Sequence, residues 1–512
     1  MRRLIVISIA IWCSSVALYA NDSLPIIEVK ADRTMIYPQR MELTGEESLM
    51  DLLQMMPELM IRGYEDLING YNLRIDNCPL NGDTRLILSQ MKAKDIAQLQ
   101  VCDNTGVAKG TIGMGKVLDI NMARPDTVKG MVEGQGSFGK NMEGIATANV
   151  LYGSQHTDLY ANASYRYQQG HKEYVSLHMT NRFDDRNKLL SYLTQQYVEQ
   201  PSAPTHKVMG RARYFHTFNS LGTELMVLGG YQYTTDPTVS TQLPMWVVEL
   251  NTPFPVKGLN LMAGFEGDYS ITRFHHADNK WNVFNHDAYL QLTYALPKWR
   301  FTAGHRVMIY HYHLVDSTAA QNHLDVRNNT NAAITYIPHF QHQIQLGYYR
   351  KFQNPDNLLL TLEECVINQI KLAYAFSRQT ITVQAGASYY FIDGAENYTA
   401  LDASVYWRSR WVTLTGGANL YIAKSQVFAS LRVAPTAYLP RQWQIALQLI
   451  YYTPKSPIRE LYSTPVYGCL SISKQIGSHW SLGVDWHDMF DSFCSEAKLN
   501  RHAANVKVQY RF

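Results

Sequence analysis

The chain has 512 residues, of which 46% are hydrophobic, 12% aromatic and 17% charged, and its formal net charge is +3. So small a positive charge argues against a nucleic-acid partner. The 34 tyrosines and 9 tryptophans favour a protein whose rings lie at a membrane–water interface. Beyond the N-terminal segment no apolar run is long enough for a transmembrane helix, so any crossing of a membrane requires strands.

The N-terminus has the form of an export signal. Arg2 and Arg3 precede an apolar stretch at residues 4–17, and the small residue Ala20 follows. These are the charged, apolar and cleavage segments of a secretory signal peptide. We expect residues 1–20 to be removed.

Five cysteines remain after this segment. In an oxidising periplasm Cys78 could pair with Cys102, and Cys469 with Cys494, which would leave Cys365 over. The alternative, that all five are unpaired small apolar residues, is equally compatible with the sequence.

Residues 40–122 are predicted to form a small α+β domain after an N-terminal extension at 21–39. Residues 44–47 match a capping box, which predicts a helix start. Pro57 ends this helix, whose apolar residues recur at helical spacing: Leu49, Leu52, Leu53 and Met56.

From residue 124 to 512 the sequence predicts a transmembrane antiparallel β-barrel. Segments alternate in hydropathy and are separated by turn residues, as in Val412–Ile422. We expect about 22 strands, within a range of roughly 18 to 22, enclosing the α+β domain in the lumen. The longer loops are expected at 182–204, 236–257 and 353–364.

The last strand has two distinct faces. One face carries Val506, Val508, Tyr510 and Phe512, and the other Lys507, Gln509 and Arg511. This segment resembles the closing strand of bacterial outer-membrane barrels. The resemblance implies that Val508, Tyr510 and Phe512 form a signal read by the barrel-assembly machinery.

Three segments resemble the plug domain of TonB-dependent outer-membrane receptors. Residues 49–60, with Pro57, resemble the opening helix of the plug, and residues 95–101 resemble a later plug segment. The strongest match is a glycine-rich turn leading into the final plug strand, with Gly106, Gly110, Gly113, Gly115 and Asn121. The overall sequence pattern is similar to that of compact receptors from Bacteroidetes-type bacteria.

The segment that follows the signal peptide resembles the TonB box of this family. In the family this extended segment pairs edge to edge with a strand of the energy transducer. The alternative is an ordinary N-terminal tail. The matching residues are Ile26, Ile27, Glu28, Val29, Lys30 and Ala31.

Three other motifs are better explained by structure than by chemistry. The glycines at 134–139 mimic a dinucleotide motif, but no helix follows. His311 and His313 share a strand face, and we interpret them as wetted or interfacial histidines rather than metal ligands. The polar cluster at 485–491, with Asp485, His487 and Asp488, is interpreted as loop polarity, because no serine has a nucleophile setting.

The barrel segments carry several arginines. We expect these side chains to face the lumen, where they would solvate the plug or line a substrate path. They are Arg166, Arg211, Arg213, Arg306, Arg350, Arg408 and Arg432.

The resemblance implies a receptor in the outer membrane of a Gram-negative bacterium, with a small extracellular ligand and a TonB-type transducer as partners. It implies no bond chemistry, so we predict no enzyme, no cofactor and no metal. Two alternatives remain: a passive or structural barrel without energy coupling, and a barrel enzyme or adhesin with its site in the loops.

Overall fold

The computed structural model describes residues 27–29, 33–40, 49–54, 72–75, 78–79, 88, 91–102, 117–123, 128–138, 143–167, 170–199, 204–218, 222–254, 256–276, 280–315, 320–339, 341–353, 365–378, 380–394, 396–424, 426–453, 465–477, 479–486, 489–490 and 504–511. The expected signal peptide at 1–20 lies outside the described residues. The domain boundaries stay predictions.

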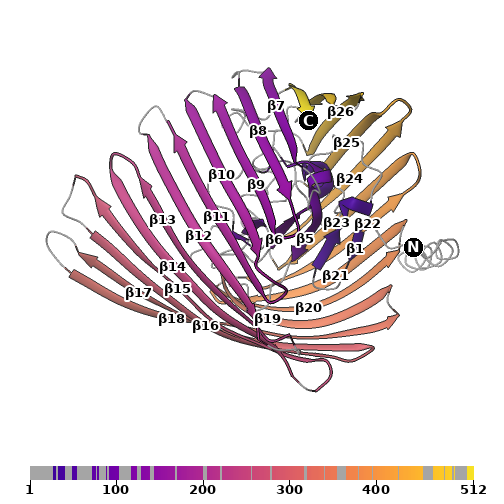
Figure 1. Ribbon diagram of the computed structural model, residues 1–512. Helices are drawn as coiled ribbons and strands as arrows, with labels where there is room; N and C mark the ends of the chain where they lie inside the picture. Colours follow the sequence, from indigo (N-terminus) through magenta and orange to yellow (C-terminus); the bar gives the residue numbers. More distant parts are fainter. Residues whose placement is uncertain are drawn as a thin grey trace.

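Twenty-two strands, β7 to β28, close into one antiparallel barrel (Figure 1). Each strand pairs with the next along the chain, and β28 pairs with β7, where Val506 is opposite Gly136. Closure satisfies the backbone hydrogen bonds at both edges, which a strand-built protein needs in lipid. The predicted barrel and its strand number are confirmed.

The barrel strands follow one another with short connections. Their bounds are β7 Lys129–Phe138, β8 Glu143–Gly153, β9 Thr157–Tyr167, β10 His171–Arg182, β11 Asn187–Val198, β12 Thr205–Thr217, β13 Glu224–Thr235, β14 Val239–Pro253, β15 Leu259–Phe274, β16 Lys280–Ala295, β17 Trp299–Val315, β18 Ala320–His339, β19 His342–Gln353, β20 Cys365–Arg378, β21 Ile381–Ile392, β22 Tyr398–Arg408, β23 Val412–Ala423, β24 Val427–Leu439, β25 Trp443–Tyr452, β26 Val466–Ile476, β27 Trp480–Trp486 and β28 Ala504–Arg511.

Two of the expected long loops are strands. Residues 182–204 contain β11, and residues 236–257 contain β14. Pro244 lies within β14, although proline cannot donate a hydrogen bond to a ladder. In the structure Pro244 is opposite Tyr231 on β13, and the pairing of β14 with β15 is interrupted only around this residue.

The two ends of the barrel differ in their connections. At one end, here called the short-turn end, every connection has six residues or fewer. At the opposite, long-loop end lie the three connections of more than ten residues, at 354–364, 453–465 and 487–503. In outer-membrane barrels the short turns face the periplasm and the longer loops face outward.

A second, six-stranded sheet lies inside the barrel, and its indigo strands are visible within the ring in Figure 1. Its strand order is β1-β2-β5-β6-β3-β4, and only β3 and β6 run parallel. We call it the inner sheet. Its elements are β1 Ile27–Val29, β2 Arg33–Ile36, η1 Pro38–Arg40, α2 Leu49–Gln54, β3 Asn72–Ile75, β4 Cys78–Pro79, η2 Ala93–Asp95, β5 Ile96–Cys102 and β6 Val117–Met122.

The predicted helix forms the centre of the core of this inner part. Leu49, Leu52 and Leu53 on α2 are fully buried. They belong to one apolar cluster with Leu99 of β5 and with barrel residues such as Tyr406. Because the barrel wall contributes to this cluster, the inner sheet and the barrel share one core. Met56 and Pro57 lie outside the described residues.

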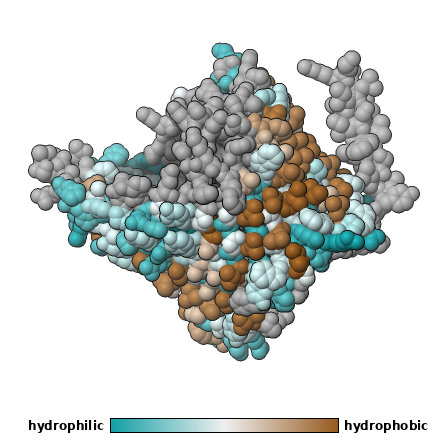
Figure 2. All heavy atoms as spheres, turned by 90° about the horizontal axis from the view of Figure 1, so that it is seen from above, coloured by the Kyte–Doolittle hydropathy of each residue, from teal (hydrophilic) through white to brown (hydrophobic). Residues whose placement is uncertain are grey.

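Side chains on the barrel strands alternate between lipid and lumen. On β28, Val508 and Tyr510 are exposed and Gln509 is buried, as the sequence pattern predicts. Hydrophobic residues form continuous brown patches on the face shown in Figure 2. Phe512 lies outside the described residues. No helix of the described chain is long and apolar enough to cross a membrane.

The register of the inner sheet rules out one possible disulfide. Cys78 begins β4 and Cys102 ends β5, and β6 and β3 lie between these strands. Three strand spacings of about 4.8 Å separate the two backbones by roughly 14 Å. A disulfide needs Cα atoms within about 7 Å, so Cys78 and Cys102 do not pair in this fold. Cys469 is buried on β26, and Cys494 lies outside the described residues.

Candidate functional site: the inner sheet and the polar wall of the lumen

The N-terminal strand β1 occupies one edge of the inner sheet. It pairs antiparallel with β2, so that Glu28 is opposite Met35. It also lies beside β20 and β21 of the barrel wall. Ile27, Glu28 and Val29 of the expected TonB box are therefore in extended conformation, while Ile26, Lys30 and Ala31 lie outside the described residues.

A chain of side-chain hydrogen bonds connects β1 with β6, the strand of the inner sheet that comes last in the sequence. The Tyr37 hydroxyl donates to Glu28 Oε2 at 3.1 Å, and Gln98 Nε2 donates to the Tyr37 oxygen at 3.3 Å. Asn121 Nδ2 in turn donates to Gln98 Oε1 at 3.3 Å. Asn121, predicted as a plug-motif residue, thus lies at the far end of a chain that begins at the expected TonB box.

Tyr37 is held in this position from several sides. The Arg40 guanidinium lies over its ring, 3.7 Å from the centroid. Partial burial, together with the nearby Glu28 carboxylate, raises the pKa of Tyr37 above its ordinary value. The Tyr37 hydroxyl therefore stays protonated at neutral pH and can donate a hydrogen bond to Glu28.

A buried ion pair joins the inner part to the barrel. Lys92 Nζ lies 2.8 Å from Glu133 Oε2, and each side chain is 5% exposed. Lys92 precedes η2, and Glu133 lies on β7. A buried pair of this kind is strongly destabilised when one partner is removed, so it fixes where the inner sheet rests against the wall.

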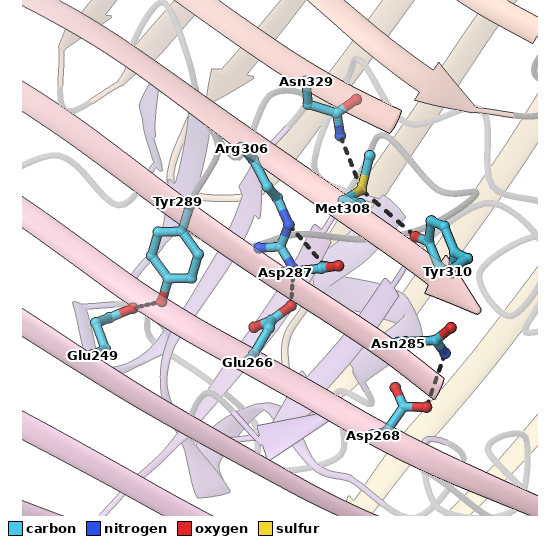
Figure 3. Close-up of polar contacts among 10 residues, drawn as sticks. All are labelled: Glu249, Glu266, Asp268, Asn285, Asp287, Tyr289, Arg306, Met308, Tyr310 and Asn329. Carbon is cyan, nitrogen blue, oxygen red and sulfur yellow. Dashed lines mark hydrogen bonds and ion pairs between the residues drawn. The ribbon is translucent and has the colours of Figure 1, made fainter. Parts of the chain in front are cut away.

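The lumen side of β14 to β18 carries a concentration of polar side chains (Figure 3). The strand register places them in transverse rows. In the first row Tyr289 is opposite Gly264 on one side and Arg306 on the other, and Glu249 is opposite Gly264. The next row contains Glu266 and Asp287.

Gly264 permits a side-chain contact that crosses a strand of this wall. The Tyr289 hydroxyl on β16 donates to Glu249 Oε2 on β14 and crosses β15 at Gly264. A Cβ atom at Gly264 would lie 2.2 Å from the Tyr289 ring. Only glycine leaves room for this contact.

Arg306 is the centre of the second group of contacts. Its Nε donates to Asp287 Oδ2 at 3.0 Å, and its Nη2 forms ion pairs with Asp287 and Glu266. The guanidinium carbon also lies 5.2 Å from the centroid of the Tyr289 ring. With only 1% of its side chain exposed, Arg306 neutralises two carboxylates that the lumen wall would otherwise have to accommodate unpaired.

Further polar contacts extend this wall toward the long-loop end. Asn285 Nδ2 donates to Asp268 Oδ1 at 2.9 Å. The Arg327 guanidinium lies 4.8 Å from the centroid of the Tyr310 ring. The result is a lumen face with fixed donors, acceptors and charges, which is suited to guiding a polar solute.

The structure shows which side of the barrel wall several of the arginines named in the sequence analysis face. Arg166, Arg306 and Arg432 are buried on the lumen side, as predicted. Arg350 is different: it shares the outward side of β19 with the exposed Leu346 and Tyr348, so its predicted lumen position is wrong. The strict alternation of β19 decides this, since the sequence does not show which set of alternate positions faces out.

The other sequence motifs have structural explanations where the structure describes them. The glycines at 134 and 136 lie in β7, a barrel strand. Asp485 accepts a hydrogen bond from Ser471 Oγ at 2.5 Å and forms an ion pair with Lys507. His487, Asp488 and the plug-motif residues Pro57, Gly106, Gly110, Gly113 and Gly115 lie outside the described residues. Among the described residues, no group of three or more His, Cys, Asp or Glu side chains is arranged to hold a metal ion.

Sequence reasoning did not find the contacts among Glu249, Tyr289 and Arg306. The three residues come from three strands and share no motif. The sequence does show that polar and apolar residues alternate along β14 to β17. This alternation does not reveal which residues become neighbours across strands.

The fold defines the chain as a large outer-membrane-type barrel with a second sheet inside it. Among solved structures it is similar to the siderophore receptor PirA from Pseudomonas aeruginosa, with a TM-score of 0.69, 12% identity, and coverage of 95% of this chain and 100% of PirA. It is also similar to the ferric-catecholate import receptor Fiu from E. coli K12 in its open form, with a TM-score of 0.70, 11% identity, and coverage of 94% and 97%. For the ferric citrate transporter FecA in the unliganded form the TM-score is 0.69 at 12% identity, with coverage of 94% and 97%.

At these identities the likeness is one of fold. No protein-family model matches the chain. A search of curated proteins found no significant match either.

Proposed function

We propose that this protein is an outer-membrane receptor that takes up a small extracellular ligand through a plug rearrangement coupled to a TonB-type energy transducer. The observation that carries this proposal is the position of β1. The strand expected to bind the transducer forms an edge of the inner sheet and is connected by Tyr37, Gln98 and Asn121 to the strand that precedes the barrel.

This arrangement supports a pulling mechanism. An edge strand can be recruited by a strand of a partner through main-chain hydrogen bonds. Force applied at β1 would act on β2 through their ladder and on β5 and β6 through Tyr37 and Gln98. The inner sheet lies inside the barrel, and its displacement would open a path for the solute.

The polar wall supports passage of a small polar or charged ligand. Its donors and carboxylates lie on the lumen side of β14 to β18. The solved structures with this fold are described as receptors and transporters of siderophores and ferric complexes. On that basis we propose a chelated metal ion as the first ligand class to screen, in the outer membrane of a Gram-negative bacterium, with assembly by the barrel-assembly machinery through Val508, Tyr510 and Phe512.

The two other functions are less well supported. A passive barrel would not need a strand at the sheet edge linked to the rest of the inner sheet. A loop-borne hydrolase would need an activated nucleophile, yet the described Asp485 is engaged by Ser471 and Lys507. Both remain distinguishable by experiment.

The test is binding of the mature protein in detergent to the periplasmic domain of its host's TonB protein. A version without residues 21–33 is the matched control. Binding that is lost with the deletion would support the energised receptor. Absence of binding by both forms, with and without ferric chelates, would contradict it and favour the passive barrel.

A further inference from the structure

Arg350 lies on the outer face of the barrel, where a charge is unexpected. On β19 the buried Gln345 and Tyr349 face the lumen, while Leu346 and Tyr348 are 53% and 39% exposed. Arg350 continues the outward set. A cation on a lipid-facing strand position is destabilising unless it reaches the membrane interface or a partner.

Arg350 belongs to a polar row that crosses four strands. Along the ladder, His305 of β17 is opposite Thr330 of β18, Thr330 is opposite Arg350, and Arg350 is opposite Asn368 of β20. His305 Nδ1 and Thr330 Oγ1 are 2.8 Å apart. The Tyr348 hydroxyl donates to Asn368 Oδ1 at 2.9 Å.

Within this row, Arg350 and Asn368 lie at the boundary of the apolar band on the outer face of the barrel. Arg350 is near the end of β19 and Asn368 near the start of β20, next to the connection at 354–364 on the long-loop end. On the membrane side of this pair the outward positions are apolar: Ile344, Leu346, Ile370 and Leu372. A tyrosine, an arginine and an amide above such a band are at the depth of lipid headgroups.

The charge of this surface favours an anion. No carboxylate of the described chain lies within ion-pair distance of Arg350. The outward positions of β12 to β20 include no aspartate or glutamate among the described residues, whereas they include the basic side chains of Arg273, Lys280 and Arg350. A guanidinium that has no carboxylate partner among the described residues of this surface is complementary to a phosphate.

We propose that Arg350, Asn368 and Tyr348 form a binding site for the phosphate group of an outer-leaflet lipid. The guanidinium and the Asn368 amide donate to the phosphate oxygens, and the acyl chains lie along Leu346, Ile370 and their neighbours. The site is independent of energy coupling and of the ligand that the lumen carries.

The test is native mass spectrometry of the full mature protein. The protein is released from detergent in the presence of lipid A, which is the probe. A dephosphorylated lipid A with the same acyl chains and inorganic phosphate are the comparison ligands. Arg350→Gln is expected to weaken retention of lipid A roughly tenfold, the effect of losing one charge-assisted contact. Arg378→Gln, at the short-turn end of the neighbouring strand β20, is the matched control.

Retention of lipid A by the wild type and by Arg378→Gln, but not by Arg350→Gln, would support the site. Equal retention of the phosphorylated and dephosphorylated lipids would overturn it, as would equal losses in the two variants. Binding of inorganic phosphate in place of the lipid would also overturn it, since the proposal requires the acyl chains to contribute. The melting temperature of lipid-free Arg350→Gln should equal that of the wild type, which excludes misfolding as the cause.

Discussion

Lys92 Nζ lies 2.8 Å from Glu133 Oε2, and this buried ion pair connects the inner part of the chain to the first strand of the barrel. Lys92 precedes η2 and Glu133 lies on β7, and no ladder among the described strands joins the inner sheet to the barrel. Their contact is electrostatic rather than part of the backbone pairing, so it can be broken without unfolding either sheet.

Removing Glu133 is expected to loosen the inner sheet. In Glu133→Ala the Lys92 ammonium would remain buried without its partner, which costs about 3–5 kcal/mol. Hydrogen exchange at residues 91–102 should therefore increase, while exchange in β14 to β18 stays unchanged. The double variant Lys92→Met/Glu133→Leu should recover most of the protection. Unchanged exchange in the single variant would show that the pair does not hold the inner sheet.

Gly264→Val is expected to displace the Tyr289 ring and break its hydrogen bond with Glu249. The added side chain would occupy the space that the ring uses, and such overpacking costs about 1–3 kcal/mol. Thermal unfolding in detergent should report a lower midpoint. The matched control is Gly229→Val on β13, where a Cβ meets nothing within 4 Å. Equal midpoints for the two variants would contradict the role of Gly264.

Arg306→Leu is expected to destabilise the barrel wall more than its size change alone would. It leaves Glu266 and Asp287 without the cation that neutralises them, a loss of about 3–5 kcal/mol. Adding Glu266→Gln and Asp287→Asn to this variant removes both charges and should restore part of the stability. The comparison is made by unfolding each variant in the same detergent. If the triple variant is no more stable than the single one, charge is not the cause.

Tyr37→Phe is expected to weaken the attachment of β1 to the inner sheet. The lost hydrogen bond has a charged acceptor, Glu28, and such bonds contribute about 1.5–3 kcal/mol. At neutral pH, exchange at residues 27–29 should increase and binding of the transducer domain should strengthen. An unchanged exchange rate would show that Tyr37 does not restrain β1.

The contribution of Tyr37 should also depend on pH in a defined direction. Its pKa is raised in the folded protein, so its stabilising effect is fully present below the unfolded value of about 10 and is lost as the pH rises through the folded pKa. The difference in unfolding free energy between wild type and Tyr37→Phe should be constant from pH 7 to about 10 and fall above it. A difference that falls between pH 7 and 9 would contradict this assignment.

The sequence by itself determined the class of fold. Alternating hydropathy requires strands with one apolar face, and a surplus of such strands in lipid has only a closed barrel as its solution. The leucines at 49, 52 and 53 likewise determined a helix with one buried face, because their spacing matches a helical turn. These conclusions depend on periodicity along the chain, which each segment carries within itself.

Only the tertiary structure decided which residues meet. Alternation does not show which face is outward, so the prediction that Arg350 faces the lumen is wrong, and the residue lies on the outer wall. Nor does it give the register, which brings Tyr289 across Gly264 to Glu249 and separates Cys78 from Cys102. Register and facing depend on hydrogen bonds between strands that are distant in sequence, and a shift of one residue moves every side chain to the opposite face.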